Sequence, residues 1–234
     1  MSKSHPEQWA VNPSVHEVAD DVLAGLRAIP TTQIADAGGP VGIVGPGIGP
    51  IAGGTEICGT AVTLWTRPGD ILFVLKAPDL VGPGDVLVVD AGARPDAAVI
   101  GDILGGSLQR NGGVGLVVDG AVRDRDGLDA LGFPTFARGT HPATGSNEGP
   151  GALNVVVSCG GVPVHPGDVV RADASGVVII PAGRAGTVLE RARAVDERER
   201  GWVEQLEAGR SLSDVLGLDD RIAEARASVA DPAP

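Results

Sequence analysis

Arg123 and Asp124 are adjacent in the sequence and follow a short apolar segment, residues 115–118, through Asp119-Gly120. A guanidinium group beside a carboxylate at the exit of a buried strand can hold an anionic substrate and a divalent cation together. An arginine next to an aspartate is also the usual composition of a solvated surface ion pair. The segment alone leaves both interpretations open.

A second carboxylate with chemical interest lies in the segment Gly101-Asp102-Ile103-Leu104. If a helix begins near Gly101, the free amides of its first turn can receive a carboxylate group. The alternative is a helix that runs on from Pro95 and contains Gly101 in its interior. Asp102 would repel a bare anion, so the site makes better chemical sense with a hard cation nearby. We therefore predict that Asp102 and Asp124 form a pair of oxygen ligands, with Arg123 on the substrate.

The elements that must position these residues form a predicted βαβ unit. It consists of an apolar strand, a helix with apolar residues at i, i+4 spacing, and a second apolar strand, at residues 86–89, 95–110 and 114–118. Two fully apolar strands joined by a helical crossover should lie parallel, with both carboxyl ends at one edge. Open α/β sheets bind ligands at that edge. The pattern thus predicts that four polar residues converge there: Asp90, Asp119, Arg123 and Asp124.

Periodicity predicts further elements on both sides of this unit. Helices are expected at residues 14–29 with Ser14 as N-cap, at 31–37 with a threonine cap, and at 124–131, 184–206 and 211–216. Strands are expected at residues 57–65, 71–75, 135–137, 154–157, 162–164, 169–172 and 177–180. The Gly/Pro-rich residues 38–54 predict a long loop or irregular hairpin. Pro-Gly-Asp occurs at residues 68–70, 83–85 and 166–168, which is typical of type II turns before strands.

Composition limits the class of protein. The chain has 234 residues, of which 43% are hydrophobic and only 3% aromatic, and its formal net charge is −12. A surface this acidic repels phosphate backbones, which argues against nucleic acid as a partner. No apolar run is long enough to span a membrane and the first nine residues lack an apolar core, so we expect a soluble cytoplasmic protein. Cys58 and Cys159 lack zinc or disulfide spacing, and the four histidines lack metal-ligand spacing.

Several motifs occur in the order in which they occur in one known family. They are residues 84–90 (GDVLVVD), 101–104 (GDIL), 118–124 (VDGAVRD), 133–134 (FP) and 166–168 (PGD). In these motifs the chain resembles RraA-like proteins and 4-hydroxy-4-methyl-2-oxoglutarate aldolases, from about Thr31 to Leu218. The resemblance implies an α/β fold, an αββα sandwich of the swivelling-domain type with a C-terminal helical arm. We expect a loose segment at residues 1–13, one catalytic domain including the arm at 14–218, and a tail at 219–234.

The resemblance also implies an activity. It is that of a class II pyruvate aldolase, a lyase that uses Mg²⁺ or Mn²⁺ to cleave a 4-hydroxy-2-oxo acid and decarboxylates oxaloacetate through the same enolate. In that scheme Asp124 ligates the metal, Asp102 holds metal-bound waters and is catalytic, and Arg123 is catalytic and binds the pyruvyl group. The backbone at Gly101, Ile103 and Leu104 receives the substrate carboxylate.

The same resemblance implies an assembly and an alternative. A glutamate from the C-terminal helix of a neighbouring subunit completes the metal site in a ring-like homotrimer, or in a higher oligomer of trimers. The matching position here is Glu199, with Glu197 as the alternative. The family also contains non-enzymatic regulators that bind RNase E, so a regulator is the rival function.

The chain departs from the family at two positions. Relatives often carry Asp-Asn-Leu and His-Lys-Ala where this chain has Asp70-Ile71-Leu72 and Leu75-Lys76-Ala77. The missing Asn and His leave Lys76 alone between apolar neighbours. These departures bear on the identity of the substrate and leave the predicted metal ligands in place.

Overall fold

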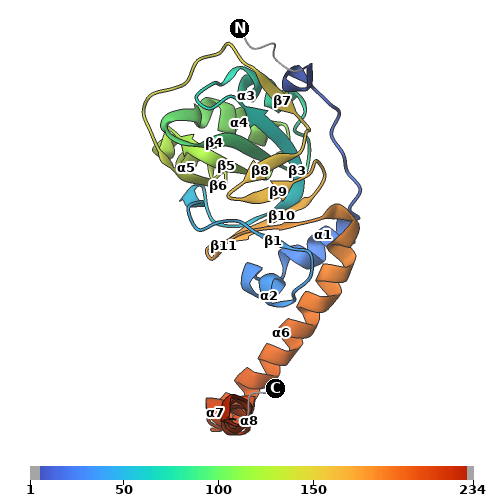
Figure 1. Cartoon of the computed structure of the whole chain (residues 1–234). Coiled ribbons are helices and arrows are strands. Elements are labelled where there is room, and N and C mark those ends of the chain that lie inside the picture. The colour runs from blue at the N-terminus through green and yellow to red at the C-terminus, as the bar shows by residue number, and fades with distance from the viewer. Residues whose placement is uncertain (1–5, 231–234) are drawn as a thin grey trace. The chain divides into compact units, whose positions relative to one another are not determined.

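The structure, a computed structural model, describes residues 6–230 and divides into two compact units. The first unit extends to Ala192 and the second begins at Arg193. Helix α6, Ala185–Glu207, begins in the first unit and continues in the second. Each unit is described by itself below (Figure 1).

The first unit is built on a large mixed sheet. Within the described residues, nine strands form it in the order β1-β11-β10-β3-β4-β5-β6-β2, with β7 pairing to β3, and β8 and β9 form a separate hairpin. The strands are β1 (Gly42–Ile43), β2 (Gly49–Ala52), β3 (Ile57–Thr66), β4 (Asp85–Ile100), β5 (Gly115–Val122), β6 (Thr135–Thr140), β7 (Gly151–Leu153), β8 (Val157–Cys159), β9 (Val162–Val164), β10 (Val169–Asp173) and β11 (Gly176–Ile180). Strands β3, β4, β5 and β6 are parallel neighbours, and the remaining pairings are antiparallel.

Helices precede, connect and follow these strands. They are α1 (Asp20–Arg27), α2 (Thr31–Asp36), α3 (Leu72–Lys76), α4 (Asp102–Arg110), α5 (Arg125–Leu131), α6, α7 (Leu212–Leu216) and α8 (Leu218–Ala230), with short 3-10 turns at Pro6–Trp9, Ala77–Asp79 and Ala182–Arg184. Helix α4 is the crossover between β4 and β5, as the predicted βαβ unit requires, and β4 pairs with β5 in parallel. The predicted parallel pair is therefore confirmed.

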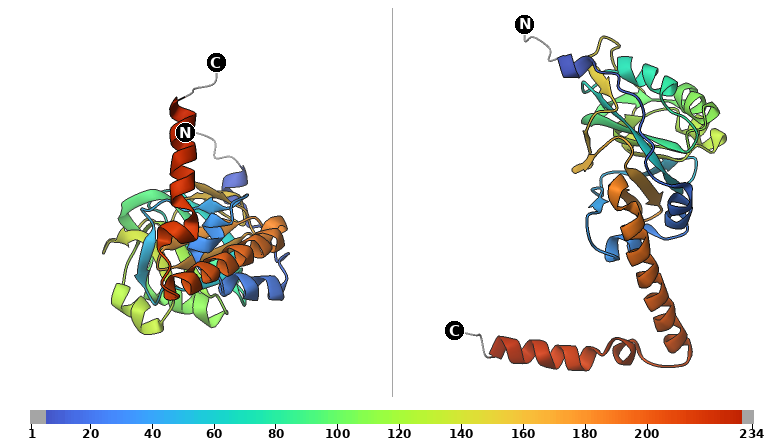
Figure 2. Two further views of the ribbon diagram at one scale, coloured as in Figure 1. Left: turned by 90° about the horizontal axis from the view of Figure 1, so that it is seen from below. Right: turned by 90° about the vertical axis from the view of Figure 1, so that its right-hand side faces the viewer.

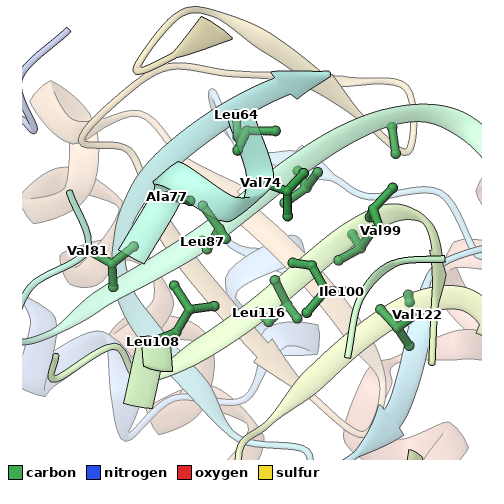
Figure 3. Close-up of a cluster of buried hydrophobic side chains, with 14 of the residues drawn as sticks. Leu64, Val74, Ala77, Val81, Leu87, Val99, Ile100, Leu108, Leu116 and Val122 are labelled. Atoms are coloured by element: carbon green, nitrogen blue, oxygen red, sulfur yellow. The ribbon is translucent and has the colours of Figure 1, made fainter. Parts of the chain in front are cut away.

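Both faces of the central strands are covered, which explains why their sequences are apolar throughout. On one face, α3, α4 and α5 pack on β3, β4 and β5 around a cluster that includes Leu87, Leu116 and Leu108 (Figure 3). On the other face, side chains of β8 and β9, such as Val157 and Val164, meet those of the central strands. A third cluster joins α1, α2 and the start of α6 to β10 and β11 (Figure 2).

Glycines let α4 and α5 approach each other closely. A Cβ atom on Gly105 of α4 would lie 2.6 Å from the Leu128 side chain of α5, and one on Gly127 of α5 would lie 2.5 Å from Asp102 Oδ2. Neither glycine leaves room for even a methyl group, since carbon contacts are normally 3.5–4.0 Å. On each helix a glycine thus leaves space for a side chain of the other helix, which lets α4 and α5 pack closely.

The three Pro-Gly-Asp segments form turns with a shared design. Gly69, Gly84 and Gly167 all have positive φ, near 80–85°, as the third position of a type II turn requires. The aspartate of each turn is buried and accepts backbone hydrogen bonds. Turn residues thereby fasten neighbouring loops to the sheet.

Asp70 is the most heavily bonded of the three aspartates. Its carboxylate accepts hydrogen bonds from Ser146 Oγ and from the amides of Leu72, Glu148 and Gly149. Burial alone would raise its pKa, but these hydrogen bonds, led by that from Ser146, outweigh it and lower the pKa to about 2.

Several local predictions were wrong. Residues 95–100 are the end of β4, so the helix predicted at 95–110 begins only at Asp102. Residues 72–76 form α3 in place of a strand at 71–75; a short apolar run fits either structure. The first helix begins at Asp20, and the Ser14 hydroxyl donates to the Leu80 carbonyl instead of capping it.

The predicted cap of the second helix also differs. Proline occupies the N-cap position of α2, and Thr31, its first residue, donates from both its amide and its hydroxyl to the buried Asp173. Near the N-terminus, where we expected a loose segment, residues 10–12 pair with Leu153 of β7. Residues 1–5 of that segment lie outside the described residues.

The second unit is helical. It contains most of α6 together with α7 and α8, and the Ser211 hydroxyl caps α7 by accepting from the Asp214 amide. The helices predicted at 184–206 and 211–216 correspond to α6 and α7. None of the described helices combines the length and the apolar character needed to cross a membrane.

Candidate active site

The carboxyl ends of β4 and β5 bring the two predicted motifs together. Ile100 is the register partner of Val122, and the Arg123 amide donates to the Ile100 carbonyl at 2.8 Å. Gly101 and Asp102 directly follow the first of these strands, and Arg123 and Asp124 directly follow the second. Two pairs of residues that are about twenty positions apart in the sequence therefore lie next to each other at one edge of the sheet.

A pocket opens between these two segments. It has a volume of about 360 Å³. Its lining residues are Ile71, Leu75, Pro78, Asp79, Val99, Ile100, Gly101, Asp102, Ile103, Leu104, Ser107, Arg123, Asp124 and Thr144. All the predicted site residues of the first unit line it: Gly101, Asp102, Ile103, Leu104, Arg123 and Asp124.

Asp124 is held in an uncommon backbone conformation. Its φ is 53° and its ψ is 44°, the left-handed region, which aspartate tolerates better than most residues. It occupies the N-cap position of α5, and its carboxylate makes no capping bond there. Oδ2 instead lies 3.2 Å from Nε of Arg123. The backbone at this point therefore directs the carboxylate into the pocket.

Gly101 supplies the space for this ion pair. A Cβ atom at Gly101 would collide with Asp124 Oδ2 and lie 3.1 Å from Arg123 Cγ. The φ of Gly101 is −132°, so glycine is required by the close approach and not by the backbone. Gly101 is also the N-cap of α4, which settles the alternatives left open by the sequence in favour of a helix that begins here.

The Asp102 carboxylate forms a hydrogen bond with one of the amides at the start of α4. Its Oδ1 accepts a hydrogen bond from the Ile103 amide at 2.7 Å. Gly127 leaves space for the other oxygen of the same carboxylate, since a Cβ atom there would lie 2.5 Å from Asp102 Oδ2. Ile103 itself is 83% exposed.

The donor set fits a hard divalent cation that keeps several of its water ligands. Asp102 and Asp124 both line the pocket, and carboxylate oxygens are the ligands that Mg²⁺ and Mn²⁺ prefer. Within residues 6–230, no group of three or more His, Cys, Asp or Glu side chains forms a complete metal site. Glu199 and Glu197 belong to the second unit, so the contribution of either one stays a prediction.

Two of the four polar residues predicted to converge do not reach the pocket. Strands β4 and β5 both continue beyond Asp90 and Asp119, which are register partners inside the sheet. Asp119 accepts from Arg138 and from the Gly160 amide, and Asp90 accepts from the Ser158 amide. These carboxylates anchor the β8–β9 hairpin on the opposite face of the sheet.

Sequence reasoning did not assign the rest of the pocket wall. Val99 and Ile100 were assigned to a helix, and Pro78 and Asp79 belong to a 3-10 turn after α3. Thr144 reaches the pocket because its segment bridges to Ala98 of β4. Of these remaining lining residues, the sequence pointed only to Ile71 and Leu75, because they replace the residues that relatives often carry. Both of them line the pocket.

Comparison with known proteins places these residues in a wider context. A family model described as RraA-like, Aldolase/RraA, matches residues 31–179. A protein of Halalkalibacterium halodurans named "Putative 4-hydroxy-4-methyl-2-oxoglutarate aldolase" is 43% identical over 184 residues, which cover 77% of this chain and 88% of that protein.

Solved structures share the fold. An uncharacterized protein from Pseudomonas syringae has a TM-score of 0.76 and 32% identity, covering 86% of this chain and 99% of its own. The RNA-processing inhibitor RraA from Thermus thermophilis has a TM-score of 0.61 and 30% identity, covering 65% of this chain and 92% of its own. These likenesses confirm the predicted α/β fold with a C-terminal helical region.

Proposed function

We propose that this chain, which belongs to the RraA-like family, is a class II pyruvate aldolase that depends on Mg²⁺ or Mn²⁺. Its substrate would be a 4-hydroxy-2-oxo acid of the 4-hydroxy-4-methyl-2-oxoglutarate type. Oxaloacetate would be decarboxylated in the same site through the same enolate.

One observation carries this proposal. The start of α4 and the Arg123-Asp124 pair line one pocket, with Gly101 leaving no more space than the ion pair needs. The pocket thus combines two hard oxygen donors, one guanidinium and a helix N-terminus. Those groups are the ones needed to bind a 2-oxo acid and to stabilise the charge of its enolate.

The two reactions share their electron flow. In the aldol cleavage the 4-hydroxyl group loses its proton, the C3–C4 bond breaks, and its electron pair moves onto the C3–C2–O2 system. In the decarboxylation the same bond breaks with loss of CO₂. In both, C3 of the resulting pyruvate enolate then takes up a proton and pyruvate leaves.

Each residue has an assigned task in this scheme. Arg123 pairs with the pyruvyl group, where negative charge develops. Asp124 and Asp102 would hold the metal ion and its waters, and Asp102 would also accept the proton released by the hydroxyl group. When bound, the divalent ion supplies Lewis-acid stabilisation of the enolate charge.

Asp102 must change its contacts for the substrate carboxylate to bind as proposed. Its Oδ1 already accepts a hydrogen bond from the Ile103 amide, which is one of the amides assigned to the substrate carboxylate. We propose that Asp102 turns from this amide toward the cation when the site fills. The amide is then released for the substrate, and the Leu104 amide lies one residue further along the same turn.

A neighbouring subunit would complete the site in this proposal. We assign Glu199 as the residue that it contributes, in a homotrimer or in a higher oligomer of trimers, with Glu197 as the alternative. Both glutamates lie on α6, beyond the boundary of the first unit.

Pyruvate release from oxaloacetate tests the proposal. We expect release that requires Mg²⁺ or Mn²⁺ and stops when a chelator is added. Asp124→Ala should abolish release while the oligomer persists in size-exclusion chromatography. Release that is indifferent to chelator, or an undiminished Asp124→Ala variant, would refute the metal assignment.

A non-enzymatic regulator that binds RNase E is the second candidate. The likeness to the RNA-processing inhibitor RraA favours it. Absence of metal-dependent pyruvate release at high protein concentration, together with inhibition of RNase E cleavage, would favour the regulator.

A further inference from the structure

The pocket has two sides that come from different parts of the chain. The proposed function places the reacting groups on one side, at the start of α4 and directly after β5. The other side includes Ile71, the N-cap of α3, and Leu75 within α3. It also includes Thr144, from the loop of residues 141–150 that joins β6 to β7 (Figure 1). The shape of the pocket therefore depends on how α3 and the β6–β7 loop are held.

Backbone contacts place the β6–β7 loop directly on the turn that precedes α3. The Ile71 amide donates to the Ser146 carbonyl at 2.7 Å, and the Ser146 amide donates to the Gly69 carbonyl at 2.9 Å. Gly145 leaves no room between them, because a Cβ atom there would collide with the Gly69 carbonyl oxygen. The loop and the start of α3 thus move as one body only while this contact persists.

The Asp70 carboxylate joins the same two segments from below. Asp70 is fully buried. Its Oδ1 accepts from the Leu72 amide at 2.9 Å and from the Gly149 amide at 3.0 Å, so one oxygen links the first turn of α3 to the end of the loop. Its Oδ2 accepts from the Glu148 amide at 2.9 Å and from Ser146 Oγ at 2.7 Å.

Only a carboxylate can serve all these donors. Each oxygen of Asp70 accepts from at least one backbone amide, and neither of those amides has a choice of orientation. An asparagine side chain carries one acceptor oxygen and one NH₂ group. In either orientation its NH₂ group would face a backbone N–H, which would lose its acceptor in a buried place. Arg67 Nη2, 3.1 Å from Oδ2, balances the charge of the carboxylate.

We propose that Asp70 is a positioning residue for this site, which holds α3 and the β6–β7 loop in the arrangement that the substrate requires. Asp70 does not line the pocket, so it acts through Ile71, Leu75 and Thr144. The inference rests on the proposed function and adds to it a residue that sets the affinity for substrate. Because the reacting groups lie on the other side of the pocket, loss of this arrangement weakens the binding of substrate and transition state alike.

Asp70→Asn tests the inference through the split between KM and kcat. With saturating Mg²⁺ we expect KM for oxaloacetate to rise by about fivefold, the effect of losing roughly one net hydrogen bond, while kcat stays within about twofold of the wild type. An unchanged KM, or a loss confined to kcat, overturns the inference.

Asp168→Asn is the control, because it makes the same change in the same kind of turn. Asp168 is also buried and follows Pro-Gly, and its two oxygens accept from the amides of His165 and Ala182. It does not line the pocket. We expect this variant to lose stability in urea unfolding and to keep the KM of the wild type. An equal rise of KM in both variants would show a general structural loss and overturn the inference.

Amide hydrogen exchange supplies a readout that does not depend on turnover. In Asp70→Asn, peptides that cover residues 71–76 and 144–149 should exchange faster than in the wild type and in Asp168→Asn, because their amides lose an acceptor. Unchanged exchange in both peptides overturns the inference.

Ser146→Ala keeps the inference testable if Asp70→Asn does not fold. It removes one hydrogen bond to Oδ2 and leaves the Asp70 carboxylate and its backbone donors in place. We expect KM to rise by about threefold with kcat unchanged. If KM does not change in this variant, Asp70 does not position the loop for substrate binding and the inference is wrong.

The wild-type measurement separates this inference from the proposed function. Absence of metal-dependent pyruvate release from the wild type refutes the proposed function, and the inference falls with it. Metal-dependent release from the wild type, together with an unchanged KM in Asp70→Asn, overturns the inference alone and leaves the proposed function standing.

Discussion

Replacement of Gly127 by alanine should damage catalysis while changing stability little. The added Cβ atom would lie 2.5 Å from Oδ2 of Asp102 and 2.7 Å from its Cβ. Because carbon contacts normally measure 3.5–4.0 Å, Asp102 must move by about 1 Å. Its Cβ is fixed to the backbone of α4, so a rotation of the carboxylate alone cannot relieve the overlap.

The expected loss of activity follows from that displacement. A misplacement of about 1 Å at a catalytic group costs roughly 100-fold in rate, so kcat/KM for oxaloacetate should fall by about two orders of magnitude. Stability changes less, because two effects oppose each other. Alanine favours the helix over glycine by about 1 kcal/mol, and the overlap costs about 1–3 kcal/mol.

Gly186→Ala is the matched control. Gly186 is the second residue of α6, as Gly127 is the third of α5, and an added Cβ there meets nothing within 4 Å. We expect unchanged kcat/KM and a small gain in the free energy of unfolding. Pyruvate release and urea unfolding would be measured on both variants. Wild-type activity in a folded Gly127→Ala variant would show that the placement of Asp102 against α5 does not matter for turnover.

Three further predictions concern other residues. Gly101→Ala should lower kcat/KM at least as much as Gly127→Ala, because its Cβ would collide with Asp124 Oδ2; activity near that of the wild type would contradict the described ion-pair geometry. Asp70→Asn should remove a stabilisation of ~2 kcal/mol that Asp70 contributes above its ordinary pKa of 3.8 and loses as the pH falls through about 2. Urea unfolding should therefore show a difference from the wild type that narrows below pH 4, and a constant difference from pH 5 to 2.5 would refute this. Glu199→Gln should abolish metal-dependent pyruvate release while Glu197→Gln retains it, and the reverse result would exchange their assigned roles.

The parts of the fold that sequence predicted are those where burial on both faces leaves an unambiguous pattern. Strand β3 was predicted from its alternating pattern and the first half of β5 from a continuous apolar run, and both strands are buried along nearly their whole length. The second half of β4 was not predicted as a strand. Its exposed residues 92–96 include a proline, a glycine and two charged residues, which is a composition typical of a turn or loop. Its pairing with β5 continues there through register shifts, which no local pattern encodes.

The predictable part of the site is the part carried by consecutive residues. Gly101-Asp102 and Arg123-Asp124 were found because each pair directly follows a strand, and parallel strands bring such residues to one edge. Asp90 and Asp119 were misassigned because the sequence does not show that both strands run on beyond them. The rest of the pocket wall depends on α3 and on the segment around Thr144, whose positions are set by contacts between distant parts of the chain.

In the proposed function, Asp102 is an intramolecular competitor for the Ile103 amide that is assigned to the substrate carboxylate. Because it is tethered beside the Ile103 amide, a carboxylate ligand binds only those molecules in which Asp102 has turned away. The apparent dissociation constant is the intrinsic one divided by that fraction of molecules. A cation that draws Asp102 toward itself enlarges the fraction. The proposed metal and a pyruvate-like anion should therefore bind with positive cooperativity, and each should tighten the binding of the other by the same factor.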